Sequence, residues 1–152
     1  MSSTKTLDQF NTIADEINSL YHRAAGKMGF SDSEFMILYM LYSYGETITQ
    51  SDIIAISGMS KQTINSAVTK MEDKGWLTRA ERSGRKRSIN LTETGRKILN
   101  EVIGPFQELE ETIFDNWTDE ERQQFIELNI RYRDAMKSIV DKMPDKGDRY
   151  VK

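Results

Sequence analysis

The sequence contains no cysteine, and it has only one histidine and two prolines among 152 residues. Without cysteine the chain can form no disulfide, thiolate zinc site, redox-sensing thiol or cysteine nucleophile. The single histidine, His22, excludes a cluster of histidine metal ligands. No apolar run approaches the length of a membrane span, and no apolar segment typical of a signal peptide opens the chain. We therefore expect a soluble, cytoplasmic protein with no metal, no cofactor and no membrane partner.

Catalytic motifs are also missing. The sequence shows no Ser/His/Asp set, no paired-carboxylate motif and no phosphate-binding loop, and its acids are spaced as i,i+4 partners on helix surfaces. We therefore predict that the protein is not an enzyme. Its length fits one domain with a real core.

Residues 49–92 contain the most informative pattern in the chain. Helix-start signals at Thr49 and Ser60 mark two short helices separated by a glycine turn, and Gly75 ends the second helix. Two strand-like runs joined by a Ser-Gly turn follow, at 76–82 and 88–91. Helix, turn, helix and hairpin in this order predict a winged helix-turn-helix, which is an architecture for binding nucleic acid.

The second of these helices, 60–74, has one apolar face and one polar face. Four of its side chains fall in a single stripe that is expected to face the core: Ile64, Ala67, Val68 and Met71. The other side is mostly uncharged and short, which suits hydrogen bonding to base edges in a major groove. An ordinary solvated surface is the alternative interpretation of this face. The candidate DNA contacts on the helix are Ser60, Lys61, Gln62, Thr63, Asn65, Ser66, Thr69 and Lys70.

Basic residues surround the predicted hairpin turn, with no acid inside the cluster: Arg82, Arg85, Lys86 and Arg87. A basic turn in this position can straddle the phosphate backbone or reach the adjacent minor groove. Residues 60–97 hold ten Lys or Arg against four acids, a net charge of +6, so the rest of this −3 chain carries −9. The basic part coincides with the predicted DNA-contacting part. The alternative, a protein-interaction module without a DNA target, would expose an apolar patch there.

Apolar spacing predicts further helices on both sides of this central region. They span 7–28, 31–44, 92–117 and 118–143, with a kink or short break expected at Gly104-Pro105. The helix at 31–44 is apolar nearly all round, so we expect it to form the buried centre of the domain. The polar tail, 145–152, is predicted to be disordered.

The outer helices carry more apolar side chains than one small domain readily covers. A homodimer formed through the N- and C-terminal helices would bury them, whereas a compact helical monomer is the alternative. The predicted division is an N-terminal dimerisation helix at 1–30, a DNA-binding region at 31–95 and C-terminal dimerisation helices at 96–144.

Three short motifs and the basic turn carry a resemblance to a known family: GMSKQT at 58–63, KGWL at 74–77 and LTETG at 91–95. Together they resemble the MarR family of bacterial transcriptional regulators, and the chain is similar to that family in length and helix order. The resemblance implies a mainly α fold with a small hairpin wing and dimerisation helices at both ends. It also implies a homodimer on double-stranded, pseudo-palindromic DNA and a repressor released by a small ligand. One position departs from the family pattern. Family wings usually carry an acid two residues before an arginine. In this chain the arginine is Arg85, and Ser83 stands in place of the acid.

Many members of that family bind small aromatic or phenolic ligands between the dimerisation helices and the DNA-binding part. The side chains that the resemblance suggests for such a pocket are Tyr21, His22, Arg23, Tyr39 and Tyr42. The alternative is that they are ordinary core residues, because aromatic side chains at helical spacing usually are. A small aromatic or phenolic effector is therefore a hypothesis.

Overall fold

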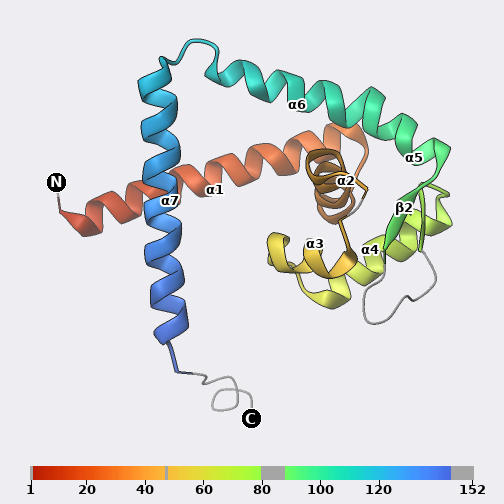
Figure 1. Cartoon of the computed structure of the whole chain (residues 1–152), viewed down its shortest axis with the longest axis horizontal. Coiled ribbons are helices and arrows are strands. Elements are labelled where there is room, and N and C mark those ends of the chain that lie inside the picture. The colour runs from red at the N-terminus through yellow and green to blue at the C-terminus, as the bar shows by residue number, and fades with distance from the viewer. Residues whose placement is uncertain (1, 47, 80–87, 145–152) are drawn as a thin grey trace. The chain divides into compact units, whose positions relative to one another are not determined.

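The computed structural model describes residues 2–46, 48–79 and 88–144. The chain forms two compact units, residues 1–107 and 108–152. The first unit begins with four α-helices, which are α1 (Ser3–Met28), α2 (Asp32–Tyr44), α3 (Gln50–Ser57) and α4 (Lys61–Asp73). It continues with the strands β1 (Leu77–Arg79) and β2 (Ile89–Leu91), then α5 (Glu93–Ile98), a π-helical stretch η1 (Leu99–Ile103) and α6 (Gly104–Glu111), which runs into the second unit (Figure 1). The predicted mainly α fold with a small hairpin is confirmed.

Side-chain caps begin the helices where the sequence predicts them. Ser31 and Thr49 form full capping boxes with Glu34 and Asp52, and the Oγ of Ser60 accepts from the backbone N–H of Thr63. These caps satisfy backbone donors that a helix start leaves without partners. Helix α1 begins at Ser3, four residues before the predicted start, because Ser2 caps it and the apolar stripe begins only later.

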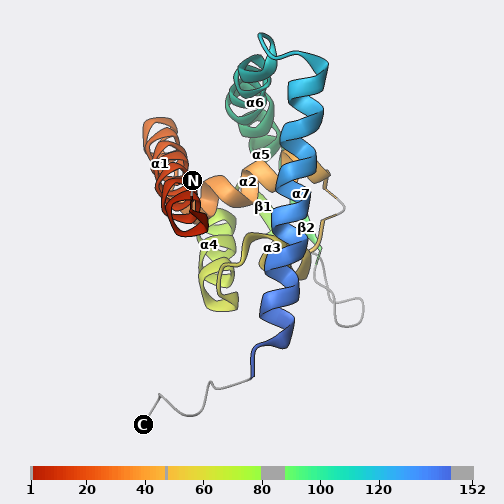
Figure 2. The same cartoon turned by 90° about the vertical axis from the view of Figure 1, so that its left-hand side faces the viewer.

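Helix α2 is the centre of the first unit, as its apolar sequence predicts. It contacts α1, α3, α4 and η1, and it lies between α1 and the pair α3–α4 in Figure 1 and above that pair in Figure 2. The largest fully buried side chains come from six different elements: Ile37, Leu38, Leu41, Ile53, Ile64, Val68, Met71, Leu77, Ile89 and Ile103. The predicted inward stripe of α4 is buried in full.

The hairpin is antiparallel, with Leu77 opposite Leu91 and Arg79 opposite Ile89. Gly75, at φ 70°, makes the turn from α4 into β1, a conformation that glycine adopts without steric cost. The strands are described over 77–79 and 89–91, and the remainder of the predicted first strand and its Ser83-Gly84 turn lie outside the described residues.

The long helix after the hairpin contains a π-helical stretch, η1, immediately before Gly104 and Pro105. A short irregularity was predicted here because proline has no N–H to donate, and π-turns inside α-helices accommodate such positions. Gly104 also leaves room for the ring of Tyr42, which lies 3.0 Å from where a Cβ would stand.

The second unit contains η2 (Thr112–Phe114) and the last helix, α7 (Asp119–Lys142). The predicted cap is present, since Thr118 and Glu121 form a capping box. Trp117 packs edge-on against Phe114 and Phe125, with ring centroids 5.2 and 5.4 Å away. No helix in the described residues combines the length and hydropathy needed to cross a bilayer. The predicted tail, 145–152, lies outside the described residues.

Candidate nucleic-acid interface

Helices α3 and α4 form a compact helix-turn-helix. The turn between them places Gly58 in the left-handed region, at φ 68°, and the N–H of Gly58 donates to the carbonyl of Ile54. The Oγ of Ser57 then accepts from the backbone N–H of Met59, so that α4 can start at Lys61. Backbone and side-chain bonds therefore fix the angle at which α4 leaves α3.

The candidate contacts on α4 lie outside the core. Its N-cap, Ser60, shares a hydrogen bond of 2.8 Å with the hydroxyl of Thr63, so these two side chains hold each other at the helix start. Asn65 is half-buried, and the remaining candidates are exposed: Ser60, Lys61, Gln62, Thr63, Ser66, Thr69 and Lys70. The helix therefore offers a continuous polar surface opposite its buried side.

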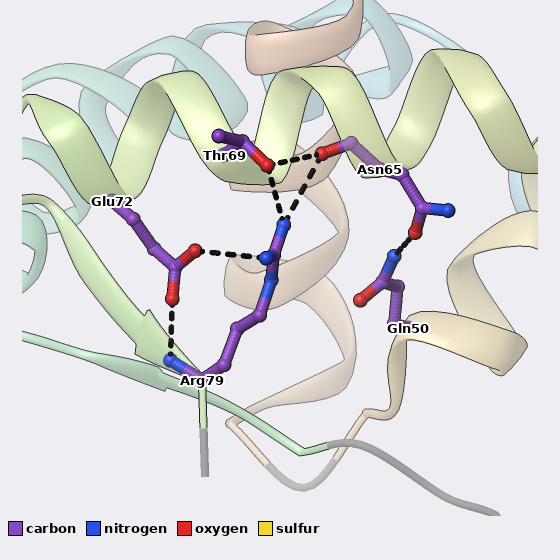
Figure 3. Close-up of polar contacts among 5 residues, drawn as sticks. All are labelled: Gln50, Asn65, Thr69, Glu72 and Arg79. Carbon is purple, nitrogen blue, oxygen red and sulfur yellow. Dashed lines mark hydrogen bonds and ion pairs between the residues drawn. The ribbon is translucent and has the colours of Figure 1, made fainter.

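A polar network ties α4 to the base of the hairpin (Figure 3). Arg79 in β1 donates from Nη2 to the carbonyl of Asn65, at 3.2 Å, and to the hydroxyl of Thr69, at 2.7 Å. Glu72 holds the same arginine twice, by accepting from its backbone N–H at 3.0 Å and by an ion pair with Nη1 at 3.2 Å. The side-chain amide of Gln50, at the start of α3, donates to that of Asn65. The network joins three elements of the predicted interface.

Sequence reasoning missed Gln50, Glu72 and Arg79. No local motif links them, because their partners come together only when α3 and the strand β1 pack against α4. A signal does exist at Arg79, which is a charged residue two positions after buried Leu77 on the same side of a short strand. A half-buried arginine there requires a carboxylate partner.

A second ion pair fixes the other end of α4. The Nζ of Lys74 lies 2.7 Å from Oε1 of Glu34, which is buried at the start of α2, and 4.4 Å from the ring centroid of Trp76. Burial would raise the pKa of Glu34, but the hydrogen bonds from Lys74 and Ser31 and the charge of Lys74 outweigh it and lower the pKa. The C-terminal end of α4 is thus held to the central helix.

The hairpin base is also connected to the neighbouring elements. Thr49 forms an isolated antiparallel bridge with Ser88, and Nε of Arg96 in α5 lies 2.9 Å from Oε1 of Glu46. The hydrogen bond from Arg96 lowers the pKa of Glu46. The predicted wing contacts lie outside the described residues: Arg82, Arg85, Lys86 and Arg87.

A separate cavity of about 320 Å³ lies between α1, α2 and the turn before α4. It is lined by Asn18, Tyr21, His22, Asp32, Phe35, Met36, Tyr39 and Met59. Three of the residues suggested for an effector pocket, Tyr21, His22 and Tyr39, are therefore brought together. Tyr42 packs against Gly104 instead, and neither Tyr42 nor Arg23 belongs to the lining.

The lining of this cavity contains one hydrogen-bonded pair, His22 and Asp32. The Nδ1 of His22 donates to the carboxylate of Asp32, at 2.7 Å from Oδ1. No Lys or Arg lines the cavity, and the walls are otherwise mainly aromatic rings and methionines, with Tyr21 edge-on to Tyr39 at 6.4 Å. Across the described part of the chain, no group of three His, Asp or Glu side chains is placed to hold a metal ion.

The comparisons with known proteins agree on one family. Residues 28–88 match the model of the MarR family. The chain is 30% identical over 110 residues to the HTH-type transcriptional regulator PecS of Dickeya dadantii, covering 70% of this chain and 66% of PecS. It is 27% identical over 111 residues to the HTH-type transcriptional repressor YetL of Bacillus subtilis, covering 70% of this chain and 65% of YetL. The chain thus spans slightly less than two thirds of both relatives.

Among solved structures, a MarR family regulator from Neisseria meningitidis superposes with a TM-score of 0.76 at 25% identity. The match covers 91% of this chain and 99% of that one. The matched family and the two curated relatives are transcriptional regulators, not enzymes.

Proposed function

The chain belongs to the MarR family of winged helix-turn-helix transcriptional regulators, and from that premise we propose that it binds a specific double-stranded DNA site as a homodimeric repressor that a small ligand releases. The observation that carries this proposal is the exposed polar face of α4, which is anchored to the hairpin through Arg79 and to α2 through Glu34. Because α4 is held by the hairpin along one side and by α2 at its C-terminal end, it can enter a major groove as a rigid recognition helix.

In this proposal α4 supplies the contacts to DNA. Its exposed candidates and the half-buried Asn65 face the major groove, where Gln62 and Ser66 are suited to base edges and Lys61 and Lys70 to phosphates. The basic cluster 82–87 contacts the flanking backbone. Gln62 has the most specific chemistry of these residues, because a glutamine amide can pair with adenine through two hydrogen bonds.

Dimerisation is supported by apolar side chains that the first and last helices leave exposed. In α1, Ile13 and Leu20 are 56% and 57% exposed, and in α7 Ile126 and Ile139 are 55% and 58% exposed. Large apolar surfaces of this kind mark contact sites. We assign residues 1–30 and 96–144 to the dimer contact and residues 31–95 to DNA, so that two copies of α4 would read a pseudo-palindromic site.

The ligand part of the proposal is supported by the 320 Å³ cavity. Its aromatic walls, the two tyrosine hydroxyls and the His22–Asp32 pair combine apolar surface with a few polar groups, as small-molecule sites do. Met59 in the lining directly precedes the N-cap of α4, so a molecule bound there would press on the start of the reading helix. Because Asp32, the only acid in the lining, already engages His22, and no Lys or Arg lines the cavity to pair with a second carboxylate, a neutral phenolic compound suits the cavity better than an aromatic carboxylate.

Selection of bound duplexes from a random pool tests the proposal. We expect enrichment of one sequence with inverted symmetry and half-site centres about 34–36 Å apart, one turn of B-DNA. Retention on DNA should fall steeply with salt, because basic side chains displace counterions from phosphates. A pool that remains unenriched would support the alternative, a winged helix that binds another protein.

A further inference from the structure

Thr69 is a candidate contact on α4 whose hydroxyl is engaged in two hydrogen bonds, one of them to the hairpin. The hydroxyl donates to the carbonyl of Asn65 at 3.0 Å and accepts from Nη2 of Arg79 at 2.7 Å. A hydroxyl has a single proton to donate. Thr69 therefore has no proton left for a phosphate oxygen or for an acceptor on a base edge.

The arginine that holds Thr69 is itself fixed. Glu72 pairs with its guanidinium at 3.2 Å and accepts from its backbone N–H at 3.0 Å, and the carbonyl of Asn65 accepts a further bond at 3.2 Å. Figure 3 shows the hydroxyl of Thr69 directed toward Arg79 and its methyl carbon directed away from it. Because threonine is branched at Cβ, fixing the hydroxyl also fixes the methyl group.

Thr69 is exposed on the same polar face as Gln62 and Ser66, which lie seven and three residues before it and so stack along one side of the helix. What this side chain can present to a ligand is thus mainly its methyl group. In a major groove the complementary partner is the C5-methyl of thymine, which no other base of DNA carries at that position.

Building on the proposed DNA-binding function, we infer that Thr69 is a specificity-determining residue that selects thymine by methyl–methyl contact. Arg79 is the positioning residue that keeps the hydroxyl of Thr69 turned inward. The interface would then use two kinds of reader on one helix: Gln62 for hydrogen bonds and Thr69 for an apolar contact.

The experiment replaces thymines one at a time by deoxyuridine in the duplex that the selection returns. This change removes only the C5-methyl and leaves base pairing intact. With the wild-type chain, one thymine in each half-site should show about a fourfold loss of affinity on replacement, which corresponds to about 0.8 kcal/mol, the transfer free energy of one buried methylene group. The other thymines should show no loss.

Two matched variants identify the residue that senses the methyl group. Thr69→Ser keeps the hydroxyl and its two bonds but removes the methyl, so the fourfold deoxyuridine effect should disappear at that position alone. Thr69→Val keeps methyl groups and removes the hydroxyl, so the effect should persist. If the effect persists in Thr69→Ser, or if no thymine in the selected site is sensitive, the inference is wrong.

A second pair of variants tests the role of Arg79. Both Arg79→Met and Glu72→Ala break the ion pair, but only the first also removes the hydrogen bond that the hydroxyl of Thr69 accepts. The deoxyuridine effect should shrink in Arg79→Met and stay at about fourfold in Glu72→Ala, in variants shown by circular dichroism to be folded. An unchanged effect in Arg79→Met would overturn the positioning role. A random pool that yields no enriched site would instead remove the proposed function itself.

Discussion

Gln62 is the residue at which base reading and backbone binding can be separated most clearly. It is exposed near the start of α4, and no hydrogen bond inside the described residues holds its side chain in the way Arg79 holds Thr69. We expect Gln62→Ala to lose about 1–3 kcal/mol on the selected site and to relax the preference at one position of each half-site. Binding to random DNA should be almost unchanged.

The matched variant for this prediction is Lys86→Ala, in the basic cluster assigned to phosphates. It should weaken binding to selected and random duplexes alike and reduce the slope of log affinity against log salt by about one unit. Fluorescence anisotropy on both duplexes at several salt concentrations gives both quantities. An equal loss on both duplexes for Gln62→Ala would show that this side chain does not read bases.

Glu34 provides a test at residue scale that does not involve DNA. Its pKa is lowered below the ordinary value of 4.5, because the bonds from Lys74 and Ser31 and the charge of Lys74 outweigh the effect of burial. A lowered pKa in the folded state stabilises the fold above the unfolded pKa, and that contribution is lost as the pH falls through the folded value. We expect Glu34→Gln to be less stable than wild type at pH 7.

The difference in the free energy of unfolding between wild type and Glu34→Gln should shrink as the pH falls below about 4.5, because protonation makes Glu34 uncharged as well. Urea unfolding at a series of pH values measures this difference and cancels the titration of carboxylates common to both proteins. A difference that stays constant from pH 7 to pH 3 would show that the ion pair with Lys74 does not stabilise the fold.

At the scale of elements, Gly95 shows how tightly the start of α5 packs against the hairpin base. A Cβ there would lie 1.9 Å from the carbonyl oxygen of Trp76 and 2.9 Å from the side chain of Leu91. The backbone must therefore move to accept any other residue, and Gly95→Ala should cost about 1–3 kcal/mol or more. Gly26 in α1 is the matched control, since a Cβ there meets nothing within 4 Å.

Gly26→Ala should stabilise the protein by about 0.5–1 kcal/mol, because alanine is the better helix former. Urea unfolding of the two variants therefore should give shifts of opposite sign. Two shifts of the same sign would mean that the close approach of α5 to Trp76 does not decide the stability at Gly95.

The elements themselves differ in how far the sequence predicts them. The sequence predicts helix α2 as the buried centre because this helix has no polar face. It also predicts the caps at Ser31, Thr49 and Thr118, because the residues of a capping box are close in sequence. The kind of irregularity in η1 was not predicted, because a proline fixes where a helix is disturbed but not how its neighbours adjust.

Some parts of the candidate site could be predicted from the sequence and others could not. The exposed face of α4 follows from helical periodicity, so its residues can be read directly from the chain. The contacts of Arg79 with Thr69 and Glu72 depend on where β1 lies on α4, which no local pattern specifies. Tyr42 was placed in the effector pocket because it lies three residues after Tyr39, but its ring packs instead at the glycine before Pro105.

At the scale of the whole molecule, the apolar face of α1 leads to a prediction about assembly. We expect light scattering to give a dimer at micromolar concentration, and Ile17→Glu to give a monomer that binds the selected duplex much more weakly, because a charge would replace an apolar contact in the dimer interface. Ser19→Glu, on the opposite side of the same exposed helix, should leave the dimer intact. A wild-type monomer, or an Ile17→Glu dimer of unchanged stability, would contradict this assignment of α1.

The effector hypothesis also belongs to the whole molecule, because it links a cavity between α1 and α2 to α4, the helix that we propose reads DNA. Met59 lines the cavity and precedes the N-cap of α4, while Lys74 at the other end of α4 is tied to Glu34. A ligand that displaces Met59 would therefore tilt α4 about its anchored end. A coupling free energy of about 1–3 kcal/mol, the usual range for allostery, would lower affinity for DNA about 5–150-fold.

Calorimetric titration with phenol-like compounds and with salicylate-like acids, each with and without the selected duplex, measures this coupling. We expect the neutral phenols to bind more tightly than the acids, because His22 is already engaged by Asp32 and no Lys or Arg in the lining could pair with an aromatic carboxylate beside Asp32. DNA must weaken ligand binding by the same factor by which the ligand weakens DNA binding. Asp32→Asn should narrow the gap between phenols and acids by removing the repulsion. If acids bind as tightly as phenols to the wild type, Asp32 does not select the ligand, and if neither binds below millimolar concentration, the aromatic side chains of the cavity serve packing alone.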